Sequence, residues 1–113
     1  MTRNTQAYLC HIRDAISQIR EYTVDGEDAF FQDRKTQDAV IRNLEVIGEA
    51  VKNLPSEITL RHTDIPWRSI AGMRDRLIHH YFGVHLRLVW TTIENRLDPL
   101  GRAIQEEIVR SKP

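Results

Sequence analysis

The chain has 113 residues, of which 41% are hydrophobic and 28% charged, and its formal net charge at pH 7 is zero. These values are ordinary for a globular protein and indicate a single domain over residues 1–113. They argue against a protein that coats nucleic acid by charge alone. The chain has no apolar run of membrane-spanning length and no signal-peptide core, so we expect a cytoplasmic protein. Cys10 is the only cysteine, which excludes an internal disulfide and zinc sites built on cysteine.

The first half of the chain predicts two long amphipathic helices. Apolar residues recur every three or four positions over residues 4–22 and again over residues 34–54. Asn4 or Thr5 is expected to cap the first helix, and Asp33 the second. Between them, residues 24–28 read as a turn and residues 29–31 as a short helical turn. Pro55 ends the second helix.

The second half predicts three further helices. Residues 56–63 form a polar connection with room for a short helix. Asp64, followed by Pro66, indicates the start of a third long helix over residues 66–81 that ends at Phe82-Gly83. A fourth is expected over residues 85–96, and Asp98-Pro99 then starts a last one that continues to about Arg110.

The fold class that follows is all-α, an up-and-down bundle of about four to five helices with short loops. Gly48 lies in the middle of the second long helix, where glycine costs roughly 1 kcal/mol relative to alanine. A close approach of another helix would explain it. Trp67 and Trp90 are expected in the core, and His62 and His85 on the surface.

One segment carries a pattern of chemical groups beyond this scaffold. Arg74, His79 and Tyr81 follow the spacing R-x4-H-x-Y. They supply a permanent cation, a group that exchanges protons near neutral pH, and a phenol that can be modified. Such a set suits the cutting or transfer of a phosphodiester. Around it, residues 61–87 hold five arginines and four histidines but only two acids.

The helical geometry of this segment raises an objection to that interpretation. At 100° per residue, Arg74 shares a face with Leu77, Ile78 and Tyr81, whereas His79 lies about 140° away. The apolar members would then be core, with Arg74 at its edge and His79 exposed. Two arrangements bring Arg74 and His79 together: a bend of the helix before Gly83, or a symmetric second subunit that faces the first across one groove.

The motif and its surroundings resemble the HepT family, a branch of the HEPN superfamily. The resemblance rests on Arg74-x4-His79-x-Tyr81 followed by Phe82-Gly83-Val84, and it covers about residues 5–108. Further matching segments are residues 43–50, residues 65–72 and Val89-Trp90. One departure is Asp75, where the wider superfamily often has asparagine. An acid there could pair with Arg74 and weaken catalysis.

The resemblance implies a HEPN-like bundle that forms a homodimer with both motifs in one cleft. It implies a toxin of a type VII-like HEPN/MNT toxin–antitoxin module, acting as a metal-independent endoribonuclease with no cofactor. A transfer RNA is the family-level expectation for the RNA substrate. The antitoxin partner would be a minimal nucleotidyltransferase (MNT) that transfers AMP to Tyr81 and silences the toxin.

The residue types agree with these roles. Metal-free cleavage uses the RNA 2′-hydroxyl as nucleophile, so it needs a proton-exchanging group, His79, and a cation at the developing phosphorane charge, Arg74. Tyr81 would position phosphate, and AMP attached there would repel RNA. Arg76 and His80 are candidates for holding backbone phosphates. Glu49 either orients an arginine or is a solvated helical acid.

A metal site is not indicated, because adjacent histidines project to different sides of a helix and the segment has few acids. A non-catalytic reading stays open: the chain would bind a nucleotide or polynucleotide as the partner subunit of a nucleotidyltransferase. The same arginines would serve it, but it has no need of a proton-exchanging group at His79. A bundle that serves only for oligomerisation is disfavoured by the concentration of Arg and His in residues 61–87.

Overall fold

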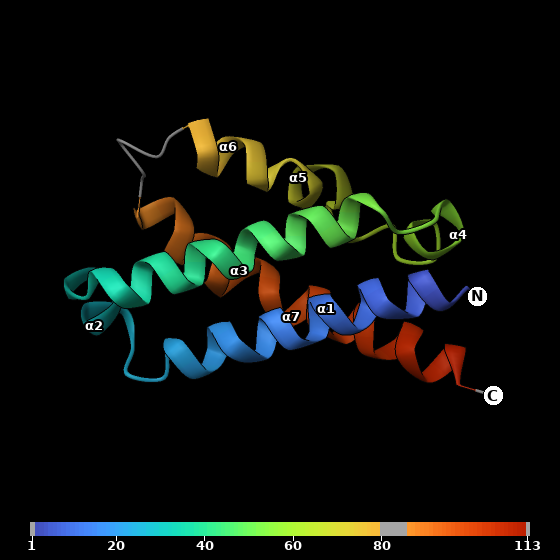
Figure 1. Ribbon diagram of the computed structural model, residues 1–113, viewed down its shortest axis with the longest axis horizontal. Helices are drawn as coiled ribbons and strands as arrows, with labels where there is room; N and C mark the ends of the chain where they lie inside the picture. Colours follow the sequence, from blue (N-terminus) through green and yellow to red (C-terminus); the bar gives the residue numbers. More distant parts are fainter. Residues whose placement is uncertain (1, 80–85, 113) are drawn as a thin grey trace.

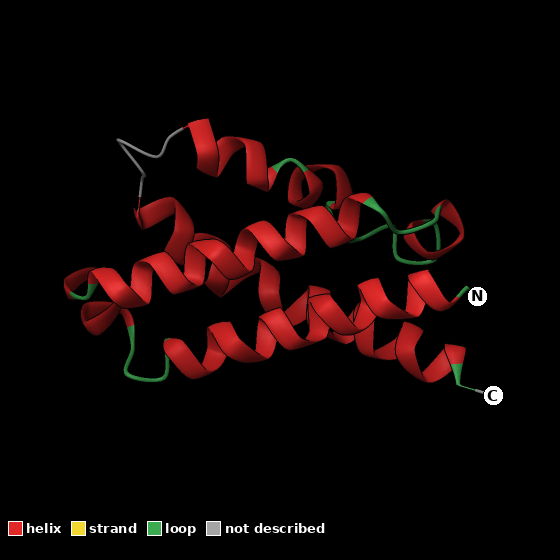
Figure 2. Ribbon diagram, viewed as in Figure 1, coloured by secondary structure: helices red, strands yellow, loops and turns green. Residues whose placement is uncertain are grey.

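The computed structural model describes residues 2–79 and 86–112, and only the backbone of residues 78 and 79. All regular structure in this part of the chain is helical, as Figure 2 shows, which confirms the predicted all-α class. The described helices are α1 (Arg3–Tyr22), α2 (Glu27–Gln32), α3 (Arg34–Lys52), α4 (Ser56–Thr59), α5 (Trp67–Ala71), α6 (Met73–His79) and α7 (Leu86–Ser111). None of them is long and apolar enough to cross a membrane.

Helix α3 lies between α1 on one side and the α5–α6 pair on the other (Figure 1). The long helix α7 packs along α1, and both chain ends lie at the same end of the bundle. Because α5 and α6 run back along α3, the chain direction of α6 is opposite to that of α3. A step forward along α6 therefore leads toward the N-terminal half of α3.

The starts of the two helices in the first half follow ordinary capping chemistry. Asp33 caps α3 as predicted, because its carboxylate accepts a hydrogen bond from the Lys35 backbone N–H at 3.1 Å. The predicted cap of α1 at Asn4 or Thr5 is wrong. Thr2 caps that helix instead, and its hydroxyl accepts from the Thr5 N–H at 3.2 Å. Thr5 is one turn inside the helix and is buried.

The predicted single helix over residues 66–81 is two short helices in the structure. The break falls at Gly72, which ends α5, and glycine is the residue that most weakens a helix interior apart from proline. Asp64, which the sequence placed at the start of this helix, lies before it. It lies in a turn closed by the Ile65 N–H bonding to the His62 carbonyl, and Pro66 occupies the N-cap position. The predicted helix end at residues 82–83 lies outside the described residues.

The two predicted helices over residues 85–96 and 98–110 are one continuous helix, α7, with Pro99 inside it. Asp98 does not cap a new helix, because its carboxylate bonds to the guanidinium of Arg20 on α1 at 2.6 Å. Buried Leu97, Leu100 and Ile104 continue one apolar stripe through the proline. Packing of this stripe offsets the roughly 3 kcal/mol that proline costs in a helix interior.

The core is a single cluster drawn from all seven helices. The largest side chains that are almost fully buried include Phe30, Leu9, Ile12, Ile19, Leu44, Ile47, Ile58, Leu100 and Ile104. Trp90 is buried beside Phe30, with ring centroids 5.3 Å apart, and Trp67 packs against the cluster, as predicted for both tryptophans. Leu77 of α6 also faces this core. Helix α6 is thus held to the bundle through its apolar side.

Gly48 marks the closest approach of α3 to the α5–α6 pair. A Cβ atom built on Gly48 would lie 3.1 Å from the Ile70 carbonyl oxygen and 3.4 Å from the Arg74 backbone nitrogen. Backbone atoms cannot swing aside as a side chain can. The sequence prediction that another helix passes close to Gly48 is therefore confirmed.

A buried carboxylate, Glu107, ties the segment before α5 to helix α7. Its side chain is 0% exposed and accepts two hydrogen bonds from Arg61, at 2.5 and 3.1 Å. The His62 ring lies 2.7 Å from the same carboxylate. His62 is only 9% exposed, so the predicted surface position for it is wrong. A buried carboxylate requires such partners, and they lie on the connection that leads into α5.

Gly48→Ala is expected to destabilise the fold by about 1–2 kcal/mol, because the new methyl group forces α3 away from the Ile70 carbonyl. Gly101→Ala is the matched control. There the new Cβ would meet only Arg20 and Ile16 side-chain atoms, at 3.7 and 3.9 Å. The control should gain roughly 0.5–1 kcal/mol from helix propensity. Urea unfolding measures both, and equal effects in the two variants would contradict the close-approach argument.

Glu107→Gln is expected to lower the free energy of unfolding at neutral pH by about 3 kcal/mol, since it leaves Arg61 without its buried anion. The hydrogen bonds from Arg61, and then from His62, lower the pKa of Glu107 from 4.5 to about 2. A pKa lowered by folding adds stability above the unfolded-state value of 4.5, and this stability is lost as pH falls toward 2.

The difference between wild type and Glu107→Gln should therefore shrink between about pH 5 and pH 2. Chemical unfolding at several pH values checks this. Exposed Glu94 on the same helix provides the control variant Glu94→Gln, which should show little change at any pH. A pH-independent difference for Glu107→Gln would contradict the assignment.

Candidate functional site

Helix α6 carries the start of the R-x4-H-x-Y motif. Arg74 and Arg76 lie on it with described side chains, and the backbone is helical through His79. The side chain of His79, together with His80, Tyr81 and His85, lies outside the described residues. The structure therefore places Arg74 and the backbone of His79, and leaves the meeting of their side chains as a prediction.

The helical backbone between Arg74 and His79 restricts how these two residues can meet. An uninterrupted helix keeps positions five residues apart about 140° apart around its axis. The described backbone between them is one unbroken helix, α6. The rest of the segment before Gly83, where the sequence allowed a bend, lies outside the described residues.

The Arg74 side chain points toward α3, where it faces Glu49. Its Nη1 atom lies 3.7 Å from the Glu49 Oε2 atom, and both side chains are about half exposed (50% and 52%). The separation is an ion-pair distance, longer than a hydrogen bond. Glu49 thus biases the position of Arg74 without occupying its N–H donors. Among the described residues, the acid that pairs with Arg74 is Glu49 and not the neighbouring Asp75.

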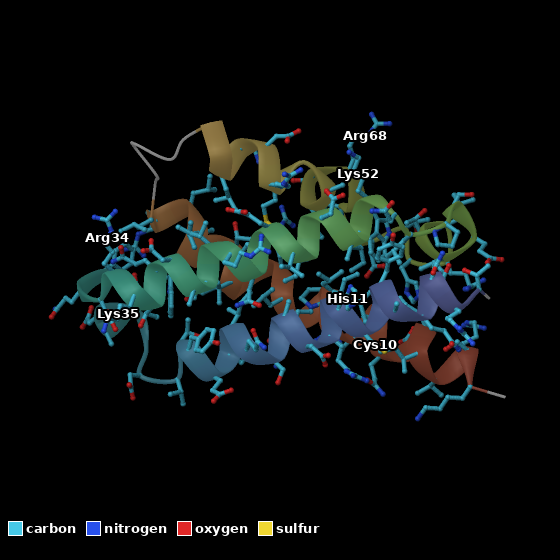
Figure 3. The ribbon with its side chains drawn as sticks, viewed as in Figure 1. Cys10, His11, Arg34, Lys35, Lys52 and Arg68 are labelled. Atoms are coloured by element: carbon cyan, nitrogen blue, oxygen red, sulfur yellow. The ribbon has the colours of Figure 1, made fainter. Side chains whose placement is uncertain are left out.

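A groove of about 380 Å³ opens beside Arg74 and crosses from α6 over α3 to α1. We call it the α1–α3–α6 groove. Figure 3 shows His11 on the side of α1 that faces α3, whereas Cys10 lies on the other side of that helix. The lining residues are Tyr8, His11, Arg42, Glu45, Val46, Glu49, Ala50 and Arg74. A candidate motif arginine therefore forms one wall of a polar groove with an apolar floor.

Arg76 points away from this groove. Its Nη2 atom donates a hydrogen bond to the Ser69 carbonyl at 2.8 Å, so the guanidinium folds back toward α5. It remains exposed and keeps donors for an anion. Arg76 thus lies on a different side of α6 from Arg74. Its role in holding RNA phosphate stays a prediction.

Two arginines of the basic stretch 61–87, Arg61 and Arg87, lie far apart in the fold. Arg61, just after α4, is bound to buried Glu107. Arg87, near the start of α7, pairs with Glu27 and lies over the Phe31 ring, 4.7 Å from its centroid. Helix α4 and the start of α7 lie at opposite ends of the bundle (Figure 1). Among the described residues of this stretch, clustering along the sequence therefore does not bring Arg61 and Arg87 into one basic patch.

Sequence reasoning missed the groove residues contributed by α1 and α3, namely Tyr8, His11, Arg42 and Glu45. Each is an ordinary polar position on an amphipathic helix. Only the packing of α1 against α3 brings them beside Arg74. By contrast, Glu107 had a readable signal, since it is an acid at helical spacing within the apolar stripe of α7.

Comparison with known proteins identifies the family of the chain. The family model described as HepT-like, ribonuclease HepT-like, matches residues 12–107. The chain belongs to the HepT-like family. The family resemblance proposed from the motif and flanking segments is confirmed, and the chain is thus a member of a ribonuclease family.

Several curated relatives agree with this membership. A "Probable ribonuclease HepT" of Thermococcus cleftensis is 49% identical over 88% of this chain and 92% of its own length. A "Putative RNase" of Caldanaerobacter subterraneus is 41% identical over 97% of this chain and 99% of its own length. A Methanocaldococcus jannaschii protein named "Gamma-glutamylcyclotransferase and putative RNase" is 45% identical over 99% of this chain, which spans 52% of that relative's length. No solved structure matches the chain.

Proposed function

We propose that this HepT-like protein is a metal-independent endoribonuclease and the toxin of a two-gene toxin–antitoxin module. The observation that carries the proposal is the family match over residues 12–107, within which Arg74 lies at the wall of a groove and its guanidinium donates no hydrogen bond to the described residues. Two relatives whose length this chain covers almost completely carry ribonuclease names. We place the protein in the cytoplasm.

In the proposed mechanism, the 2′-hydroxyl of the substrate RNA attacks the adjacent phosphorus. His79 takes the hydroxyl proton, and a protonated imidazole returns a proton to the departing 5′-oxygen. Arg74 bonds to the non-bridging oxygens, where negative charge grows in the transition state. Glu49, whose Oε2 atom lies 3.7 Å from Arg74 Nη1, orients the guanidinium for this contact. Arg76 and His80 would contact neighbouring phosphates.

A homodimer supplies the simplest way for Arg74 and His79 to act on one phosphate. The two positions diverge by about 140° on an unbroken helix, so a second copy can place its His79 opposite the first copy's Arg74. Each cleavage centre would then combine residues from both chains.

The proposed partner is an MNT-type nucleotidyltransferase that acts as antitoxin by transferring AMP to Tyr81. The phenol oxygen attacks the α-phosphorus of ATP and pyrophosphate leaves. The added phosphate and adenosine bring negative charge and bulk next to the motif, which would exclude RNA.

Arg74→Ala and His79→Ala are each expected to lower RNA cleavage at least 100-fold, because each removes one of the two groups that stabilise the transition state. Adduct-free protein is incubated with total RNA in excess chelator, and fragments are resolved by gel. Arg3→Ala, which removes an exposed arginine at the start of α1, at the end of the bundle away from the end of α6 (Figure 1), should cleave like wild type. Sedimentation shows whether all variants share one oligomeric state.

If adduct-free wild type leaves RNA intact, the ribonuclease proposal fails. The nucleotide-binding partner subunit then becomes the better account. Cleavage that persists in Arg74→Ala would show that another site carries the reaction.

Tyr81→Phe is expected to escape silencing. With the cognate nucleotidyltransferase and ATP, wild type should gain the mass of AMP on intact-protein mass spectrometry and lose cleavage, whereas Tyr81→Phe should do neither. Exposed Tyr22 provides the control Tyr22→Phe, which should be modified like wild type. Modification of Tyr81→Phe at another residue would contradict the assignment of Tyr81.

A further inference from the structure

The α1–α3–α6 groove holds polar side chains to which the described residues offer no hydrogen-bond partner. Arg42 faces Glu45 at 3.8 Å, and Arg74 faces Glu49 at 3.7 Å, both beyond hydrogen-bond length. Among the described residues, none of these four side chains makes a hydrogen bond, and neither does the Tyr8 hydroxyl or the His11 ring. The carboxylates are therefore oriented by their arginines and remain able to accept hydrogen bonds.

A second, larger groove of about 520 Å³ between α1 and α7 lacks this property. It contains Arg13, Arg20 and Arg102. Arg20 already donates to Asp98 at 2.6 Å, and Arg13 to Asp14 at 3.0 Å. Its charges are mostly committed within the protein, so the groove beside Arg74 is the better candidate for a ligand.

The walls of the α1–α3–α6 groove suit a flat ligand with a polar edge. Val46 and Ala50 provide an apolar floor, and the Tyr8 and His11 rings meet edge to face with centroids 6.3 Å apart. Nucleobases are flat, and unpaired RNA bases commonly pack on aromatic side chains. Glu45 is the more enclosed of the two acids, with 24% of its side chain exposed against 52% for Glu49.

The acid in the enclosed position selects among bases. A carboxylate accepts hydrogen bonds through two oxygens, so its best partner presents two neighbouring N–H donors. Guanine does so through N1–H and its amino group, whereas uracil presents one ring N–H and cytosine and adenine one amino group. Glu45 thus matches the guanine edge.

The direction of the groove relates it to the motif. Glu49 and Glu45 lie one turn apart along α3, and α6 runs in the opposite direction to α3 (Figure 1). A ligand that extends from Arg74 toward Glu45 therefore runs alongside α6 in the direction of His79. Its phosphate would lie at Arg74 and its base near Glu45.

We propose that this groove binds the guanine base of an unpaired nucleotide next to the phosphodiester that is cleaved. Glu45 accepts hydrogen bonds from the guanine N–H groups, Tyr8 and His11 contact the base, and Arg74 faces the phosphate. The inference rests on the proposed ribonuclease function and specifies its substrate as single-stranded RNA that contains guanosine.

Nucleotide binding tests the groove separately from catalysis. Guanosine, adenosine, cytidine and uridine monophosphates are titrated into wild type and Glu45→Gln and followed by NMR. Wild type should bind the guanosine nucleotide about tenfold or more tightly than the uridine nucleotide, and Glu45→Gln should lose this difference. Glu57→Gln, an exposed acid on α4, is the control and should bind like wild type.

Cleavage mapping on an unstructured RNA library gives the second readout. Wild type should cut next to guanosine, and Glu45→Gln should cut with relaxed sequence preference. Cleavage without base preference, or a preference unchanged in Glu45→Gln, overturns the groove assignment and leaves the ribonuclease proposal standing. Absence of any cleavage overturns the ribonuclease proposal, and the NMR titration still decides base binding. A change of oligomeric state in Glu45→Gln with no change in base preference would make the groove a subunit contact and overturn the inference.

Discussion

The backbone contact at Gly48 determines where the candidate site lies. No side chain separates α3 from the α5–α6 pair there. The approach is so close that a Cβ atom added at Gly48 would lie only 3.1 Å from the Ile70 carbonyl oxygen. The residue after Gly48 is Glu49, and Arg74 lies four residues after Ile70, just past the start of α6. Their ion pair is thus a consequence of the backbone register. The position of Arg74 depends on a steric constraint more than on the weak attraction of two exposed charges.

The connection before α5 supplies a second fixed point for the same segment. Arg61 and His62 bind the buried Glu107 of α7, and the Trp67 indole N–H donates to the His62 carbonyl at 2.8 Å. The α5–α6 pair is therefore anchored to α7 at its beginning and to α3 in its middle. The Arg61–Glu107 pair is costly to break, because loss of Arg61 leaves the buried Glu107 carboxylate without its main opposite charge. Two anchors on different helices make the short segment a rigid support for Arg74.

Sequence periodicity predicted α1 and α3 to within two residues at either end, because their apolar stripes and the Asp33 cap act locally. Periodicity gave the wrong helix boundaries where tertiary packing determines whether a helix continues. Helix α7 continues past Pro99 because its apolar stripe packs along α1 on both sides of the proline. Gly72, in contrast, divides into α5 and α6 a segment that the periodicity predicted as one helix. The motif spacing pointed to Arg74, but the groove around it joins three helices, and no local pattern reports which polar faces will meet. His62 was misplaced for the same reason, since its acid partner lies 45 residues away.

The charge balance of the groove limits how the protein can recognise RNA. Arg42 and Arg74 are each matched by a carboxylate, and the whole chain has zero formal net charge. A binder that relies on many phosphate contacts releases many counterions and depends steeply on salt. A site built from balanced pairs gains little from such contacts. For the proposed ribonuclease, recognition would then come from fitted groups near the scissile phosphodiester, which favours a short unpaired RNA segment over an extended duplex as substrate.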